Sequence, residues 1–142
     1  MSDWNRGIIE EFRANAGKVG GRFDGLPLLL LHHRGAKSQT ERVNPLAYQD
    51  LGSGAVAVFA SKGGAPTNPD WYHNVRANPA VRVEIGDQLF DGVARVAEGE
   101  ERGEIWERQK GTVRGFATYE GKTERQIPVV IIEGLTVTEP PR

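Results

Sequence analysis

Residues 60–74 of this 142-residue chain combine the side chains and backbone groups that most clearly could bind a ligand. Gly63 and Gly64 follow a lysine directly after an apolar run, and adjacent glycines can turn several backbone N–H groups toward one point. Asn68 followed by proline is typical of a helix start, where unpaired N–H groups and the helix dipole favour negative charge. The segment therefore predicts an anion-binding turn between a strand and a helix. The alternative is an ordinary strand-to-helix loop.

A second polar loop, residues 35–42, carries Lys37, Ser38 and Arg42 between two expected strands. If the fold brings this loop close to Lys62, three cations and a set of N–H groups would face one anionic ligand. A solvated hairpin loop is the alternative interpretation.

Three aromatic residues are further candidates. Trp71 and Tyr72 fall in the first turn of the expected helix, where they could border a planar ligand or cover a barrel mouth. Tyr119 lies in a glycine-flanked stretch, expected to be a loop, before an apolar strand. Its hydroxyl could donate a hydrogen bond at a site, although packing or surface exposure would also account for it.

Composition excludes several classes of function. The net charge of −1 gives no bulk electrostatic attraction to nucleic acid, and the absence of cysteine excludes disulfides, thiolate metal sites and cysteine nucleophiles. His32 and His33 are adjacent and would face opposite sides of a strand, so no metal site is expected. One of the two is expected to be a hydrogen-bonded core histidine. No nucleophile elbow or phosphate-loop motif occurs.

The N-terminal residues 3–16 predict an amphipathic helix with Trp4, Ile8 and Phe12 on one face. Packing on the domain is expected, with a lid over a site or a foot on a membrane surface as alternatives. No apolar stretch approaches the ~20 residues of a membrane span, and a basic start followed by an apolar core is missing. These features indicate a cytoplasmic protein, with peripheral contact to the inner face of the membrane left open.

Short apolar segments punctuated by glycine and proline predict a mainly β fold. The expected strands are residues 26–33, 41–48, 55–60, 81–85, 88–96 and 127–133, and the expected helices are 3–16, 68–78 and 98–109. Pro45 suggests an edge or a bulge in its strand. Because few helical crossovers are present, an antiparallel barrel with peripheral helices is favoured over a parallel sheet. The expected organisation is an N-terminal helix and linker (1–20), one barrel domain (21–135) and a loose tail (136–142).

In this order, the segments resemble the deazaflavin-dependent nitroreductase family, oxidoreductases of actinobacteria that use coenzyme F420. Four motifs carry the resemblance: G-x-K-S-x-x-x-R at residues 35–42, A-S-K-G-G-x-P followed by P-x-W-Y-x-N within 60–74, R-A-N-P at 76–79, and Y-x-x-x-T-x-R-x-I-P-V-V at 119–130. The resemblance covers residues 26–133 and implies a small antiparallel split barrel of the FMN-binding type.

The family resemblance also implies a coenzyme site. In the family, loop cations and the glycine turn hold the phosphate and acidic tail of F420, and residues at the helix start lie near its rings. By position, the coenzyme-binding residues would be Lys37, Ser38, Arg42, Ala60, Ser61, Lys62, Gly63, Gly64, Asp70 and Trp71. Ala36 stands where an arginine is usual, and Gln39 replaces a common glycine, which implies a weaker grip on the tail.

The implied reaction is hydride transfer from reduced F420 to a quinone-like or nitroaromatic acceptor. Tyr119 matches the tyrosine that would hydrogen-bond or protonate the acceptor, and Phe116, Val113 and Tyr48 would line its pocket. Phe116 and Val113 stand where further tyrosines are usual, so the pocket is expected to be less polar. The alternatives are an FMN-dependent oxidoreductase on the same barrel and a non-catalytic F420 carrier. A homodimer is the assembly left open.

Overall fold

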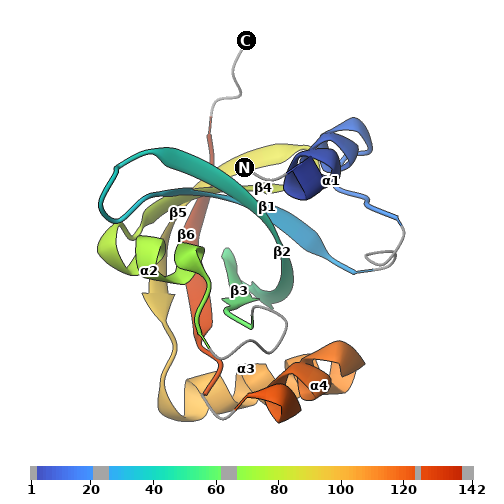
Figure 1. Cartoon of the computed structure of the whole chain (residues 1–142), viewed down its shortest axis with the longest axis vertical. Helices are drawn as coiled ribbons and strands as arrows, with labels where there is room; N and C mark the ends of the chain where they lie inside the picture. The colour runs from blue at the N-terminus through green and yellow to red at the C-terminus, as the bar shows by residue number, and fades with distance from the viewer. Residues whose placement is uncertain (1–2, 21–25, 62–66, 124–125, 139–142) are drawn as a thin grey trace.

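The computed structural model describes residues 3–20, 26–61, 67–123 and 126–138, and within these ranges six strands form a closed barrel. The strands are β1 (Leu28–Arg34), β2 (Glu41–Gly52), β3 (Ala55–Phe59), β4 (Ala80–Ile85), β5 (Gln88–Val96) and β6 (Val129–Val137). Their order around the barrel is β1-β2-β3-β6-β5-β4, with every neighbouring pair antiparallel (Figure 1). The expected mainly β, antiparallel barrel is confirmed.

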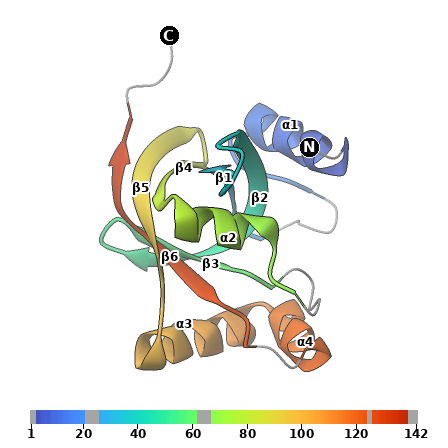
Figure 2. The same cartoon turned by 60° about the vertical axis from the view of Figure 1, so that its left-hand side comes forward.

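Four helices lie around the barrel in the part of the chain that the structure describes. They are α1 (Asp3–Ala14), α2 (Asp70–Ala77), α3 (Gly99–Thr112) and α4 (Arg114–Lys122). Helix α1 lies near one end of the molecule, α3 and α4 lie at the opposite end, and α2 crosses the side of the barrel between them (Figures 1 and 2).

Strand β1 is buried on both faces, which explains its unbroken apolar sequence. Leu29 and Leu31 belong to the cluster inside the barrel, whereas Leu28 and Leu30 pack with α1 on the outside. None of the four is more than 4% exposed. A strand covered on both sides needs no polar face, so periodicity alone could not have shown which residues point inward.

Pro45 confirms the expected edge position. Residues 41–47 of β2 pair with β1 alone, and pairing with β3 begins at Tyr48. Proline has no N–H to donate, so it is tolerated where its strand has a single neighbour.

Two sequence-based expectations were wrong. The stretch around Phe116 forms helix α4 rather than a loop, and α4 contacts α3 through Phe116 and Glu120, which are four residues apart on one helical face. The expected loose tail also begins too early, because Thr136 and Val137 still pair with Asp91 and Phe90 in the barrel.

Helix α1 packs on the barrel, as expected. Ile8, Ile9 and Phe12 are buried against Leu28 and Leu30. The side chain of Trp4 lies outside the described residues, and the lid and membrane-contact alternatives stay predictions. Among the residues that the structure describes, no helix has the length and apolar character needed to cross a membrane.

An ion pair ties the end of α1 to the barrel. Arg13 donates to the Glu84 carboxylate through Nε at 3.1 Å and Nη2 at 2.7 Å, and His32 Nε2 lies 2.6 Å from Glu84 Oε2. Burial alone would raise the pKa of Glu84, but the hydrogen bonds from Arg13 and His32 outweigh it, so this pKa is lowered from 4.5. The folded state therefore favours the ionised carboxylate.

Acid should weaken this link. Because folding lowers the pKa of Glu84, its stabilisation is complete above the unfolded-state value of 4.5 and is lost as the pH falls through the lower folded-state value. We expect Glu84→Gln to lower the Tm at pH 7, and the difference from the wild type to shrink at acid pH. Thermal unfolding followed by circular dichroism across pH 3–7 measures this. A Tm difference that is the same at pH 3 and pH 7 would contradict the conclusion that folding favours the ionised carboxylate of Glu84.

A second prediction concerns Gly92, where β5 meets β6 at a register shift. A Cβ at this position would come within 2.9 Å of Ile132 Cγ2 and of Leu135 Cδ2. We expect Gly92→Ala to reduce the free energy of unfolding by about 1–3 kcal/mol through overpacking. The matched control is Gly103→Ala in α3, where an added Cβ would have no described atom within 4 Å apart from its chain neighbours and its own helix backbone. There, helix propensity should instead add roughly 0.5–1 kcal/mol. Urea unfolding compares the two, and equal effects would refute the packing argument.

Candidate functional site

The turn between β1 and β2 is closed by its own hydrogen bonds. Gly35 N–H donates to Thr40 O at 2.9 Å, Gln39 N–H donates to Gly35 O at 3.0 Å, and Thr40 N–H donates to Ser38 Oγ at 3.2 Å. A Cβ on Gly35 would overlap Ser38 Oγ, so a larger residue there would force this hydroxyl away from its place beside the Thr40 N–H. The turn therefore presents Lys37, which is exposed, from a defined backbone.

Helix α2 holds this turn through two asparagines. Asn74 Oδ1 accepts the N–H of Ala36 at 2.9 Å, and Asn78 Nδ2 donates to Arg34 O at 3.3 Å. The bonds join residues about 40 positions apart in sequence. They place the predicted turn and the predicted helix side by side.

His33 lies behind the turn and is 3% exposed. Its Nε2 lies 2.6 Å from Asn44 Oδ1, and its Nδ1 lies 3.1 Å from Asn74 Nδ2. Burial is the main reason that the pKa of His33 is lowered. Arg42 acts in the same direction, while the hydrogen bond to Asn44 and the charge of Asp70 oppose it. His33 is thus the hydrogen-bonded core histidine that the sequence predicted, and Arg42 and Asp70 both lie close enough to act on it.

The donor set on this side of the molecule fits an anionic group. Among the described residues, neither Lys37 nor Arg42 forms an ion pair, whereas Arg13, Arg82 and Arg95 each contact a carboxylate. Unpaired cations beside a rigid turn can form charge-assisted hydrogen bonds to phosphate or carboxylate without first breaking an internal pair.

The structure describes some of the remaining predicted coenzyme-binding residues but not all of them. Ala60 and Ser61 are buried at the end of β3, where Ala60 N–H donates to Pro128 O at 3.0 Å. Lys62, Gly63 and Gly64 lie outside the described residues. Asp70 begins α2 and is exposed, and Trp71 is 4% exposed among the residues inside the barrel. Contact between Trp71 and a coenzyme ring stays a prediction.

The residues predicted for the acceptor pocket do not gather in one place. Phe116 is 7% exposed and packs edge-on against Phe59 and Trp106, with ring centroids 5.3 and 6.1 Å apart, and Val113 packs against the same cluster. Tyr48 instead packs against the cluster inside the barrel, where burial raises the pKa of its hydroxyl. Their common role in a pocket stays a prediction.

Tyr119, the predicted catalytic residue, belongs to α4. Its side chain lies outside the described residues, so its proposed proton-donating role also stays a prediction.

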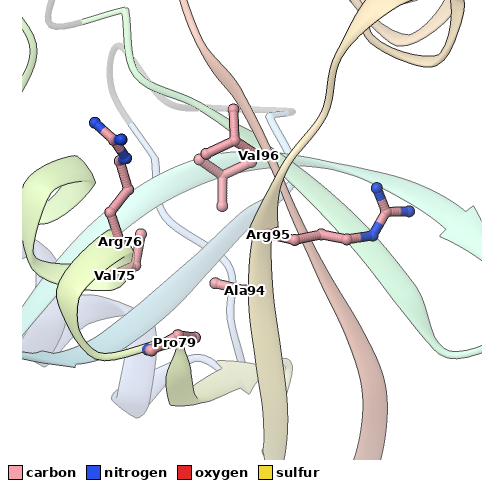
Figure 3. Close-up of a pocket in the computed structure, with 7 residues that line it drawn as sticks. Val75, Arg76, Pro79, Ala94, Arg95 and Val96 are labelled. Carbon is pink, nitrogen blue, oxygen red and sulfur yellow. The ribbon is translucent and has the colours of Figure 1, made fainter.

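A cleft of about 190 Å³ lies between α2 and β5 (Figure 3). It is lined mostly by apolar side chains, namely those of Val75, Pro79, Ala94, Val96 and Val130, with Arg76 and Arg95 completing the lining. The guanidinium of Arg95 points away from the cleft (Figure 3). It donates hydrogen bonds to the carboxylates of Glu101 and Glu133. The cleft is smaller than the ~300–1,000 Å³ typical of cavities that bind drug-sized ligands.

Arg102 is a residue that sequence reasoning missed. It lines a neighbouring cavity of about 330 Å³ that Tyr72 also lines, and its buried Nε has no hydrogen-bond partner among the described residues. Its Nη2 donates to Ile127 O at 2.6 Å, and its guanidinium lies 5.4 Å from the Trp106 ring centroid. Burial lowers the pKa of Arg102, against the opposing charges of Glu120 and Glu107. A lone arginine in an acidic segment was the sole sequence signal.

Several known proteins resemble this chain in sequence and fold. The sequence model of a family described as F420H(2)-dependent quinone reductase matches residues 4–134. An F420H(2)-dependent quinone reductase of Mycobacterium tuberculosis (strain ATCC 25618 / H37Rv) is 35% identical over 125 residues, which are 85% of this chain and 83% of the relative.

Two solved structures resemble the chain as well. An F420-H2 dependent reductase, FDR-A, is 44% identical with a TM-score of 0.69, covering 75% of this chain and 94% of that one. A protein solved as a domain-swapped dimer is 40% identical with a TM-score of 0.71, covering 92% and 98%. The resemblance seen in the sequence is confirmed: the chain belongs to the F420H(2)-dependent quinone reductase family and is an oxidoreductase whose coenzyme is F420.

Proposed function

We propose that this chain reduces a quinone with hydride from reduced F420, and that the turn between β1 and β2 binds the anionic tail of the coenzyme. The observation that supports this most directly is the pair of cations, Lys37 and Arg42, beside a turn fixed by Asn74. Neither cation has a carboxylate partner among the described residues, and the family uses a coenzyme with a phosphate and an acidic tail.

Bound F420 in its reduced form supplies a hydride, that is two electrons and one proton. A quinone that accepts a hydride needs one further proton to become a quinol. We assign that proton to Tyr119, by a hydrogen bond that strengthens as negative charge develops on the quinone oxygen. The protein otherwise contributes position, because hydride transfer requires donor and acceptor in direct contact.

The residues at the start of α2 and the glycine turn complete the proposed coenzyme site. Asp70 and Trp71 would lie near the deazaflavin ring, and Ser61 with Lys62 to Gly64 would hold the phosphate. The helix N-terminus favours negative charge in the same region. A nitroaromatic compound is a second candidate acceptor, because the sequence resembles enzymes that reduce such compounds.

Turnover with a defined acceptor tests the proposed function. We expect the full-length chain to oxidise reduced F420 in the presence of a soluble menaquinone analogue, followed by the recovery of F420 absorbance. Tighter binding of FMN than of F420 would favour the flavin-dependent alternative. Binding of F420 without oxidation above background would favour the carrier.

The cations of the turn give a direct mutational test. We expect Lys37→Ala and Arg42→Ala each to weaken F420 binding by about tenfold or more, because each removes a charge-assisted contact worth roughly 1.5–3 kcal/mol. Fluorescence titration of the coenzyme measures the Kd. Lys18→Ala, an exposed lysine near the end of α1, is the matched control and should leave the Kd unchanged. An unaltered Kd in both turn variants would remove the turn from the site.

Tyr119→Phe separates chemistry from binding. If the hydroxyl donates to the acceptor, kcat should fall by about 10²-fold or more while the Kd of F420 stays within a factor of two. Stopped-flow oxidation of reduced F420 gives the rate. The control Thr136→Val removes an exposed hydroxyl on β6, away from the proposed site residues, and should leave kcat unchanged. Equal activity of Tyr119→Phe and wild type would make Tyr119 a packing residue.

A homodimer and contact with a membrane surface are also proposals. A structural relative forms a domain-swapped dimer, which supports testing this chain for a homodimer by light scattering. For contact with a membrane surface the structure offers less support, because the apolar residues Ile8, Ile9 and Phe12 of α1 are already covered by the barrel.

A further inference from the structure

A chain of hydrogen bonds joins the turn to three elements of the fold. It runs from the N–H of Ala36 to Asn74 Oδ1, from Asn74 Nδ2 to His33 Nδ1, and from His33 Nε2 to Asn44 Oδ1. The distances are 2.9, 3.1 and 2.6 Å. The chain thereby connects the turn, α2, β1 and β2.

The two central side chains, Asn74 and His33, are buried, and each of their side-chain nitrogen and oxygen atoms takes part in a hydrogen bond of this chain. Asn74 is 8% exposed and His33 is 3% exposed. The carboxamide nitrogen of Asn74 can only donate, so His33 Nδ1 accepts and the proton of the neutral imidazole is assigned to Nε2, which donates to Asn44. The lowered pKa of His33 keeps this neutral form dominant at pH 7. Removing one member would leave a buried polar group without a partner.

The turn depends on this chain for its position on the barrel. The bonds from Gly35 to Thr40 and from Thr40 to Ser38 fold the turn on itself, and the bond from Asn78 to Arg34 O joins the cap of α2 to the end of β1, before the turn. The bond from Ala36 to Asn74 reaches α2 from within the turn, and Lys37 and Ser38 follow Ala36 directly. The side chain of Asn74 therefore holds the backbone from which Lys37 and Ser38 project.

We infer that Asn74 and His33 are positioning residues for the anionic tail of F420. They act through the N–H of Ala36 and need not touch the coenzyme. The inference rests on the proposed binding of the tail at this turn. A general role in folding would affect binding of every part of the coenzyme. The positioning role instead predicts that the loss of Asn74 weakens binding of the tail and leaves binding of the deazaflavin ring unchanged.

Comparison of two ligands tests this inference on the full chain. The Kd of F420 and the Kd of a deazaflavin that ends at its ribityl group, without phosphate or carboxylates, are measured for the wild type and for Asn74→Ala. We expect a tenfold or larger loss for F420 and a change within a factor of two for the shorter ligand. His73→Ala, an exposed residue on the same helix, is the control and should change neither.

Amide hydrogen exchange gives a readout without ligand. In Asn74→Ala the Ala36 amide should lose its protection, while the Gly35 amide, which is bonded to Thr40 within the turn, should keep it. If Asn74→Ala does not fold, Asn44→Ala at the half-buried end of the chain should give the same pattern in weaker form.

The outcomes are separable. Equal weakening of both ligands, or unchanged F420 binding with Ala36 still protected, would overturn the positioning role while leaving the proposed function in place. Wild-type protein that binds the shorter ligand as tightly as F420 would instead remove the tail site, and with it both proposals.

Discussion

The double burial of β1 is the constraint on which the rest of the structure depends. This strand pairs with β2 on one side and β4 on the other, which closes the barrel. Leu29 and Leu31 fill the interior, and Leu28 and Leu30 provide the surface on which α1 packs. Because both faces of β1 are apolar, a shift by one residue would still bury leucines, so its register is held by the pairing with β2 and β4 rather than by an alternation of apolar and polar residues.

Several cations of this protein of net charge −1 pair with carboxylates, whereas Lys37 and Arg42 at the turn form no ion pair among the described residues. Arg95 binds two carboxylates, and Arg13, Arg82 and Lys110 each contact at least one. Exposed pairs of this kind contribute little to stability, but they neutralise the surfaces on which they lie. The charges of Lys37 and Arg42, which no carboxylate among the described residues pairs, stay available to an incoming anion. Local arrangement, rather than total charge, carries the argument for an anionic ligand.

The sequence predicted the barrel because short apolar strands separated by glycine and proline leave few other architectures. It also predicted an edge or a bulge at Pro45 and a core histidine at one of His32 and His33, and the structure shows which alternative holds in each case. Helix α4 was missed because Gly115 and Gly121 lower helix propensity over a short stretch, and its stabilising contacts come from α3.

The links within the site could not be predicted for a related reason. Asn74 and His33 are 41 residues apart, and their contact depends on where α2 crosses the barrel. Tyr48 and Phe116 lie in separate clusters because side chains alternate along β2. Tyr48 packs inside the barrel, whereas its neighbour Ala47 lies outside and packs against the cluster that contains Phe116. Single-sequence reasoning finds residues with chemical potential, but the fold decides which of them meet.

The aromatic cluster at the far end of the barrel connects packing to the proposed chemistry. Phe116 packs edge-on against Phe59 and Trp106, and Glu120 accepts hydrogen bonds from Trp106 Nε1 at 2.5 Å and Lys110 Nζ at 2.9 Å. These contacts fix α4 on α3 from both sides of position 119. A tyrosine at position 116, where the side chain is buried, would bring a hydroxyl into this apolar cluster, where it would need a partner. Phenylalanine there holds the helix through apolar contact, so the position of Tyr119 depends on a packed core rather than on a polar pocket.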